Sequence, residues 1–241
     1  MKTRALPALF LAAAAALACT DNRMSVEPFG LCSPPTDATQ CTFASTCSSY
    51  VLGSLGLFLR KAQNLDGSGP TVFNELVTVM QFNNQMLNTA DETAGRTNAN
   101  DAYIREWRLS FDLVEARDAS GTIVIPAGGL AIPDASVSTQ GATVPANGSA
   151  TTFATIIPLD TDVFLSNALA TFGAVTAKVN AHLRASGITN GGAFFETGDY
   201  LVPVDISTAI FGGYACTPAT DVPVAVCPNS GQTASFACAT P

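Results

Sequence analysis

The chain has 241 residues, which is long enough for one large domain or two small ones, and 47% of its residues are hydrophobic. Only 12% are charged, and 19 acidic residues against 11 basic ones give a net charge of −8 at pH 7. Binding of nucleic acid depends on clustered Lys and Arg. The sequence contains no such cluster, so its composition argues against a nucleic-acid partner.

The N-terminus has the features of a secretory signal. Lys2 and Arg4 precede an uncharged stretch of 14 residues, Ala5 to Ala18, that is rich in Ala and Leu. A membrane-spanning helix needs about 20 apolar residues, so this stretch is too short to span. With positive charge before it and small residues at its end, it predicts a signal peptide over residues 1–18. A buried core helix is the alternative interpretation.

The end of the stretch, Ala16-Leu17-Ala18-Cys19, resembles the lipobox of bacterial lipoproteins. The resemblance implies cleavage before Cys19 and lipidation of Cys19, which would hold the protein to a membrane without a spanning helix. Leu17 lies one position later than in most members of that family, so ordinary secretion with cleavage near Ala18 stays open. Thr20, rather than Asp, follows Cys19, which by analogy with enteric lipoproteins implies the outer membrane.

Six further cysteines predict a disulfide framework, because an even number in an exported chain is typical of paired cysteines. They are Cys32, Cys41, Cys47, Cys216, Cys227 and Cys238. A zinc site is less favoured, since no Cys-x-x-Cys occurs. Three of these cysteines lie near each end of the chain, so complete pairing requires at least one bridge between the ends. We expect one such bridge and one local bridge at each end, which favours a single domain; spacing leaves the connectivity open.

The first part of the chain predicts a tether and then strands. Residues 19–49 have few apolar side chains and predict a tether with a cysteine-pinned loop. A first strand is expected near residues 51–61, before the turn sequence Asp66-Gly67-Ser68-Gly69-Pro70. From Leu76 to Phe82, apolar and polar residues alternate as in a strand covered partly on both faces. Residues 88–100 are polar and predict a long loop.

The clearest strand begins at Tyr103. Trp107, Leu109 and Phe111 share one face and polar residues share the other, which predicts a half-buried antiparallel strand with Trp107 in the core. One helix is expected at residues 162–172, with Asp162 as its N-cap. Further strands are expected at 122–125, in isolated pieces within 126–150, and at 153–159, 175–184 and 200–206.

These elements predict a mainly β protein. Six or seven short strands separated by turn signals favour an antiparallel β-sandwich over residues 50–241, with one short helix and a cysteine-rich C-terminal end. Helices are too few for parallel βαβ units.

Two segments also resemble a known group of proteins. Asn98-Ala99-Asn100 before the Trp107 strand, and the tail from Gly187 through Thr197-Gly198-Asp199-Tyr200 to Cys238, resemble the uncharacterised exported lipoproteins of myxobacteria and related deltaproteobacteria. The resemblance implies an immunoglobulin-like sandwich and brings no known activity. Members often carry two close cysteines after the Pro-containing strand, where this chain has Asp205 and Ser207, so its local disulfide pattern departs from theirs.

Residues that could carry chemistry are few. The single histidine, His182, falls on the polar face of its strand near Lys178 and Arg184, where we expect it to be solvated rather than held in a catalytic triad. Asp160 with Asp162, and Asp66 with Ser68, could offer oxygens to calcium, but helix capping by Asp162 and a turn at Asp66 explain them better. Asn147-Gly148-Ser149 matches a glycosylation sequon and is interpreted as a turn. The sequence therefore predicts no catalytic, cofactor-binding or metal-binding residue.

Three functions remain open at this point. The first is a non-enzymatic lipoprotein of the cell envelope or surface with a structural or interaction role. The second is a binding module for a glycan or a calcium-dependent ligand, using the loops at 88–100 or 126–150. The third is a hydrolase that uses carboxylates only. The membrane is the expected partner through Cys19, and a protein or glycan partner stays unidentified.

Overall fold

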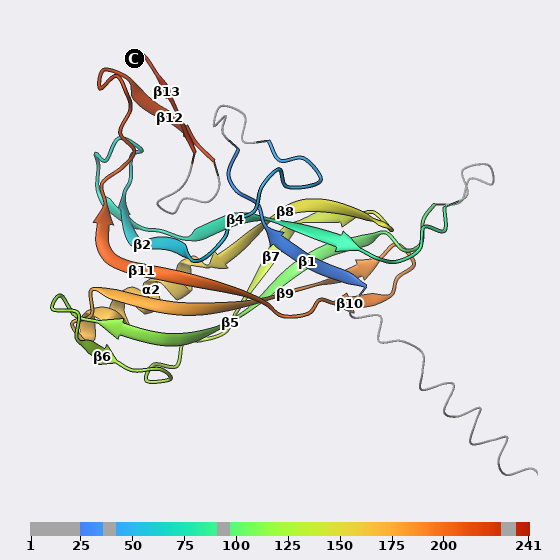
Figure 1. The fold of residues 1–241 in the computed structure, drawn as a ribbon, viewed down its shortest axis with the longest axis horizontal. Coiled ribbons are helices and arrows are strands. Elements are labelled where there is room, and N and C mark those ends of the chain that lie inside the picture. The colour runs from blue at the N-terminus through green and yellow to red at the C-terminus, as the bar shows by residue number, and fades with distance from the viewer. Residues whose placement is uncertain (1–24, 36–41, 91–96, 228–234) are drawn as a thin grey trace, which may run out of the picture.

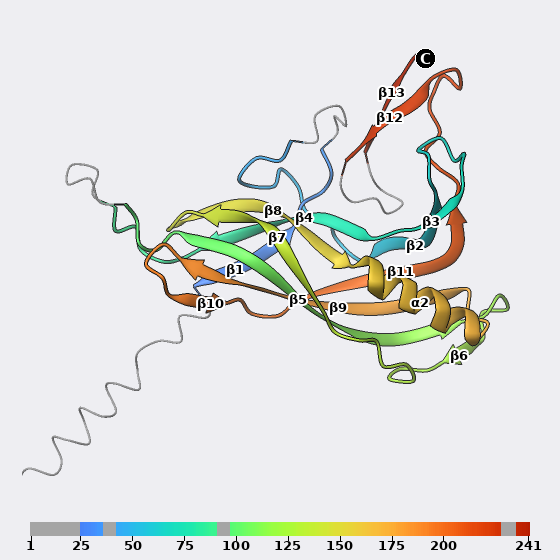
Figure 2. The ribbon, with the colours of Figure 1, turned by 180° about the vertical axis from the view of Figure 1, so that it is seen from behind.

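A computed structural model of the protein describes residues 25–35, 42–90, 97–227 and 235–241. The predicted signal peptide, Cys19 and Cys41 lie outside the described residues. Two β-sheets pack face to face, and helix α2 (Leu159–Thr171) lies against one end of them (Figures 1 and 2). The predicted mainly β sandwich is confirmed.

The smaller sheet has the order β1-β4-β8, formed by β1 (Val26–Leu31), β4 (Leu76–Asn84) and β8 (Gly148–Ile157). The larger sheet has the order β3-β2-β11-β9-β5-β6, with β10 also paired to β9 and β7 to β5. Its strands are β2 (Leu55–Ala62), β3 (Thr71–Phe73), β5 (Ala102–Arg117), β6 (Ile123–Ile125), β7 (Ala135–Val144), β9 (Thr176–Thr189), β10 (Phe194–Glu196) and β11 (Tyr200–Phe211). A separate pair follows, β12 (Val222–Val226) with β13 (Phe236–Ala239).

The strand order is that of an immunoglobulin-like sandwich. β1, β4 and β8 take the positions of strands A, B and E, and β5, β9 and β11 those of C, F and G. Trp107 lies on β5, where this fold places its buried strand-C tryptophan. It is 1% exposed, and its ring centre lies 5.5 Å from that of Phe82 on β4. The predicted burial of Trp107 is confirmed.

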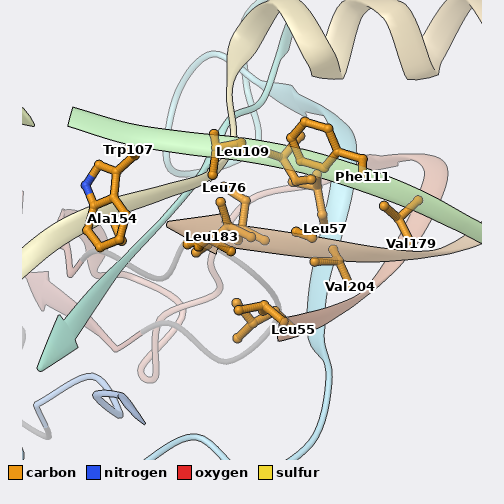
Figure 3. Packing of buried hydrophobic residues seen from close by; sticks show 14 of the residues in the cluster. Leu55, Leu57, Leu76, Trp107, Leu109, Phe111, Ala154, Val179, Leu183 and Val204 are labelled. Carbon is orange, nitrogen blue, oxygen red and sulfur yellow. The ribbon is translucent and has the colours of Figure 1, made fainter. Parts of the chain in front are cut away.

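The core lies between the two sheets. Alternate residues of β5, β9 and β11 point inward, and β2, β4 and β8 add aliphatic side chains from the other strands (Figure 3). Leu165 and Leu169 of α2 close one end of this core and are fully buried. A single apolar cluster therefore joins both sheets and the helix.

Three sequence predictions need correction. The large sheet is not wholly antiparallel, because β2 and β11, its first and last long strands in chain order, are neighbours within it and run parallel. The helix starts at Leu159 rather than residue 162, with Pro158 at the N-cap position. The segment predicted as a tether contributes β1, because Val26 and Leu31 are buried against β4 although few other residues of that segment are apolar.

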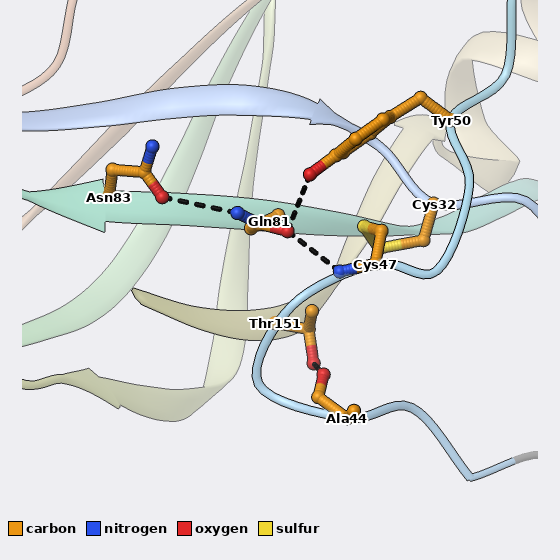
Figure 4. Close-up of a disulfide and its surroundings, with 7 residues drawn as sticks. All are labelled: Cys32, Ala44, Cys47, Tyr50, Gln81, Asn83 and Thr151. Carbon is orange, nitrogen blue, oxygen red and sulfur yellow. Dashed lines mark hydrogen bonds between the residues drawn. A yellow bond between two sulfur atoms is a disulfide. The ribbon is translucent and has the colours of Figure 1, made fainter. Parts of the chain in front are cut away.

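The loop after β1 folds over the outer face of the small sheet. A Cys32–Cys47 disulfide, with Cα atoms 5.2 Å apart, ties the loop to the end of β1 (Figure 4). Gln81 on β4 accepts hydrogen bonds through Oε1 from the Cys47 amide at 2.7 Å and from the Tyr50 hydroxyl at 2.9 Å. These two hydrogen bonds give the buried side-chain oxygen of Gln81 its partners, since the residue is only 4% exposed.

The expected local disulfides form at both ends of the described chain. Cys216 pairs with Cys238, with Cα atoms 5.9 Å apart, as Cys32 pairs with Cys47. Cys227 is fully buried and is also disulfide-bonded. Because Cys41 lies outside the described residues, the bridge between the two ends stays a prediction.

Candidate functional site: a charged cluster on the large sheet

The outer face of the large sheet carries a set of charged side chains that we call the charged cluster. Alternation along β5 and β9 turns these side chains away from the core, since their strand neighbours Leu109, Phe111 and Leu183 are buried. The cluster comprises Glu106, Arg108, Asp112, His182, Arg184, Glu196 and Asp199. Six of its seven side chains therefore project from strands, and Asp199 comes from the short segment between β10 and β11.

His182 lies between two carboxylates. Its Nδ1 is 2.8 Å from Asp199 Oδ2 and its Nε2 is 3.1 Å from Asp112 Oδ2. Asp112 comes from the adjacent strand β5, and Asp199 from the segment just before β11. A doubly protonated ring donates to both carboxylates, whereas a neutral ring donates to one. Both ring nitrogens are thus engaged within the cluster.

Two arginines face each other across the strands. The register places Arg108 directly opposite Arg184, an arrangement that repels unless acids intervene. Glu196 supplies the acid: its carboxylate lies 3.2 Å from Arg108 Nη1 and 3.8 Å from Arg184 Nη1. Asp199 adds a contact of 3.6 Å to Arg184 Nε. Acidic side chains therefore hold the two guanidinium groups in place.

Glu106 is also fixed in its charged form. The Ser136 hydroxyl donates to it and holds the pKa of this carboxyl below its ordinary value; Ser186 and Arg108 act in the same direction. Arg108 Nε lies 3.5 Å from Glu106 Oε2.

A shallow depression of about 440 Å³ lies at the cluster and is lined by five of its members, Arg108, His182, Arg184, Glu196 and Asp199, together with Ser110 and Asp134. A serine–histidine–aspartate triad needs one imidazole nitrogen on the nucleophile and the other on the carboxylate. In His182 both nitrogens contact carboxylates, so the geometry suits recognition of polar or charged groups better than activation of a serine. His182 does lie on the outer face, as predicted, with a side chain that is 27% exposed.

Sequence analysis missed this cluster for a specific reason. Along its own strand, His182 has only Lys178 and Arg184 as charged neighbours. Its acidic partners come from a neighbouring strand and from a separate segment, so only the strand register brings them together. The polar faces of the two strands were visible in the sequence, but the register was not.

The other candidate residues have structural roles. Asp66 accepts from the Ser68 amide at 2.9 Å and hydroxyl at 2.7 Å, which confirms the turn; these bonds lower the pKa of Asp66. Asn147 has a φ of 53°, as a turn requires, between β7 and β8. Within the described part of the chain, no group of three or more His, Cys, Asp or Glu side chains could hold a metal ion.

Asp162 does not cap the helix, contrary to the prediction. The Asp162 side chain is fully buried. Its Oδ2 accepts only a long hydrogen bond of 3.3 Å, from the backbone N–H of Asn74. Burial raises the pKa of Asp162 to about 7, while the Asn74 amide and the charge of Arg60 oppose the shift. Among the described residues, Asp162 Oδ1, Asn74 Oδ1 and Thr78 Oγ1 are buried oxygens without a hydrogen-bond partner.

Comparison with known proteins identifies no relative: no protein-family model and no curated protein matches the chain. No helix of the described residues is both long enough and apolar enough to cross a membrane.

Proposed function

We propose that the protein is an exported, lipid-anchored interaction protein of the cell envelope, attached through Cys19 and placed at the outer membrane. The charged cluster is its recognition surface, and its role is binding rather than catalysis. The observation that carries this proposal is the arrangement of Arg108, His182 and Arg184, all on strands β5 and β9, among carboxylates.

Two further observations support the proposal. Disulfides persist in oxidising compartments outside the cytoplasm, and both local bridges favour export. The basic residues are also unevenly distributed. Among the described residues, those on β5 and β9 are Arg105, Arg108, Arg117, Lys178 and Arg184, which leaves only Arg60 and Lys61 elsewhere. An acidic protein therefore gathers most of its described basic side chains on two strands, where they alternate with carboxylates and offer a partner charged groups of both signs.

Membrane attachment is tested by replacing Cys19 with Ser. We expect the wild-type chain to fractionate with membranes and to incorporate labelled fatty acid, and Cys19→Ser to do neither. A Cys19→Ser variant that still pellets with membranes and still carries the label would contradict the anchor.

Recognition by the cluster is tested with one charge reversal and a matched control. Fluorescently labelled protein is titrated onto intact cells of the producing bacterium that lack the gene, and binding is measured by flow cytometry. We expect saturable binding that weakens with added salt, since exposed charges are screened beyond about 8 Å at 0.15 M ionic strength. Arg184→Glu should weaken binding about tenfold, the effect of about 1.4 kcal/mol.

Lys61→Glu, at the end of β2, introduces the same charge change away from the cluster and should bind like the wild type. Equal binding of wild type and Arg184→Glu would remove the charged cluster as the recognition surface.

A further inference from the structure

A second surface lies away from the charged cluster, between β7 and β8. These strands follow one another through the turn at Asn147, but β7 joins the large sheet and β8 the small one, so they separate beyond the turn (Figure 2). A groove of about 760 Å³ lies there. Val137 of β7, Phe153 of β8 and Trp107 from the core all line it.

β8 turns the backbone groups of alternate residues toward this groove. The Val79 carbonyl on β4 accepts from the Cys32 amide, so the backbone groups of Val79 face β1. Phe153 is the partner of Val79 in the antiparallel ladder, and its N–H and C=O must then point away from β4. Trp107 Nε1 donates to that Phe153 carbonyl at 3.2 Å, which confirms its direction. By the same alternation, the backbone groups of Thr151 and Thr155 also face the groove.

This edge lacks the features that normally protect edge strands. Exposed edges usually carry charged residues or Pro, which prevent pairing with another chain. β1, at the other edge of the same sheet, carries Glu27 and Pro28. β8 contains neither a charged residue nor Pro over its ten residues, and β7 contains neither over its ten. One edge of the small sheet is therefore blocked and the other is open to pairing.

We propose that the groove binds an extended, uncharged peptide segment of a partner protein, which adds to β8 as an antiparallel strand. Main-chain hydrogen bonds to Thr151, to Thr155 and to the N–H of Phe153, whose carbonyl already accepts from Trp107, would provide affinity, and alternate side chains would face Trp107 and Val137. The residues that line the groove are all uncharged, so a charged side chain on the inward face would lose its hydration without gaining a partner.

A single segment fits this groove better than a second copy of the chain. The open edge from Thr151 to Thr155 spans five residues, about 17 Å at the usual rise per residue of a strand. A second copy would have to bring its own β7 into the groove together with its β8. The occupant is therefore a short strand that is free on both sides.

The probe is a synthetic peptide with the sequence of β4, LVTVMQFNN, because this sequence already pairs antiparallel with the opposite edge of β8. Trp107 is the only tryptophan of the chain and lines the groove, so its emission reports insertion. We expect a saturable change in emission with the full-length protein. Hydrogen exchange should slow at the amides of Thr151, Phe153 and Thr155. A peptide with Lys in place of its two valines should not bind.

Thr155→Pro removes an amide that faces the groove and leaves the β4 ladder intact, and it should weaken peptide binding at least tenfold. Thr71→Pro is the matched control, since its amide faces the free edge of β3, and it should bind like the wild type. Should Thr155→Pro fail to fold, Thr155→Lys tests the same edge through charge. Arg184→Glu should bind the peptide normally, which separates this proposal from the charged cluster.

Three results would overturn the assignment. The first is the absence of any saturable change in Trp107 emission and in amide exchange. The second is equal binding of the peptide by wild type and Thr155→Pro. The third is a dimer in sedimentation velocity that Thr155→Pro converts to a monomer, because the edge would then bind a second copy instead of a peptide.

Discussion

Replacing the buried Asp162 with Asn should stabilise the protein at pH 8 much more than at pH 4. Asp162 is fully buried in the first turn of α2, and its pKa is raised from 3.8 to about 7 by desolvation. The folded state therefore favours the neutral carboxyl. Its contribution to stability is complete below pH 3.8, declines as the pH rises toward about 7, and is absent above that value. Asn keeps the shape of the side chain and does not titrate.

The size of the effect follows from the shift. One pKa unit corresponds to about 1.4 kcal/mol, so ionising Asp162 in the folded protein costs at most about 4 kcal/mol. The difference in the free energy of unfolding between Asp162→Asn and wild type should therefore grow by up to about 4 kcal/mol from pH 4 to pH 8. Comparing the two proteins at each pH cancels the titration of all other carboxyls.

Urea denaturation followed by the emission of Trp107 measures this difference. Asp160→Asn is the matched control, since Asp160 is exposed in the same first turn of the helix and should show no comparable pH dependence. The reasoning fails if the difference between Asp162→Asn and wild type is the same at pH 4 and pH 8, because Asp162 would then titrate near its ordinary pKa.

Two further predictions concern the core and the disulfides. Trp107→Ala should lower the free energy of unfolding by about 3–5 kcal/mol, as large core truncations do. Urea denaturation followed by circular dichroism measures this difference. Ready quenching of the native Trp107 emission by acrylamide would contradict the burial of this side chain. Non-reducing peptide mapping should recover the bridges Cys32–Cys47 and Cys216–Cys238 and a peptide that joins Cys227 to the N-terminal region, where Cys41 is the cysteine left over. A free thiol at Cys227 would contradict the crossing bridge.

The strands that sequence analysis predicted are those with large side chains in alternation. Trp107, Leu109 and Phe111 mark β5 clearly, because a half-buried strand must alternate its apolar residues. β7 is different, since Ser, Thr and Ala make up most of it and give only weak alternation. β1 was missed because Pro28 and Gly30 interrupt its pattern. Both strands are fixed by pairing with β5 and β4, which a local pattern does not reveal.

The candidate surfaces depend on the same non-local information. Sequence analysis placed His182 on an outer face but not beside Asp112 and Asp199, since these contacts require the register of β9 against β5. It likewise predicted a structural role for Asp162, but burial turned the side chain toward Asn74 instead of the helix end. The lack of charge in β7 and β8 was readable in the sequence. That both strands are edges became visible only with the sheet order.

The early start of β1 limits how far the sandwich can stand from the membrane. If Cys19 carries the lipid, seven residue steps separate it from Val26, and a fully extended chain covers about 25 Å over that distance. Val26 pairs with Asn84, and Asn84 also pairs with Gly148, so the turn between β7 and β8 lies at the same end of the sandwich as the anchor. The membrane would thus restrict approach to this end. A partner reaching the groove would have to enter from the side, parallel to the lipid surface, while α2, at the far end of the sandwich, would face away from the bilayer.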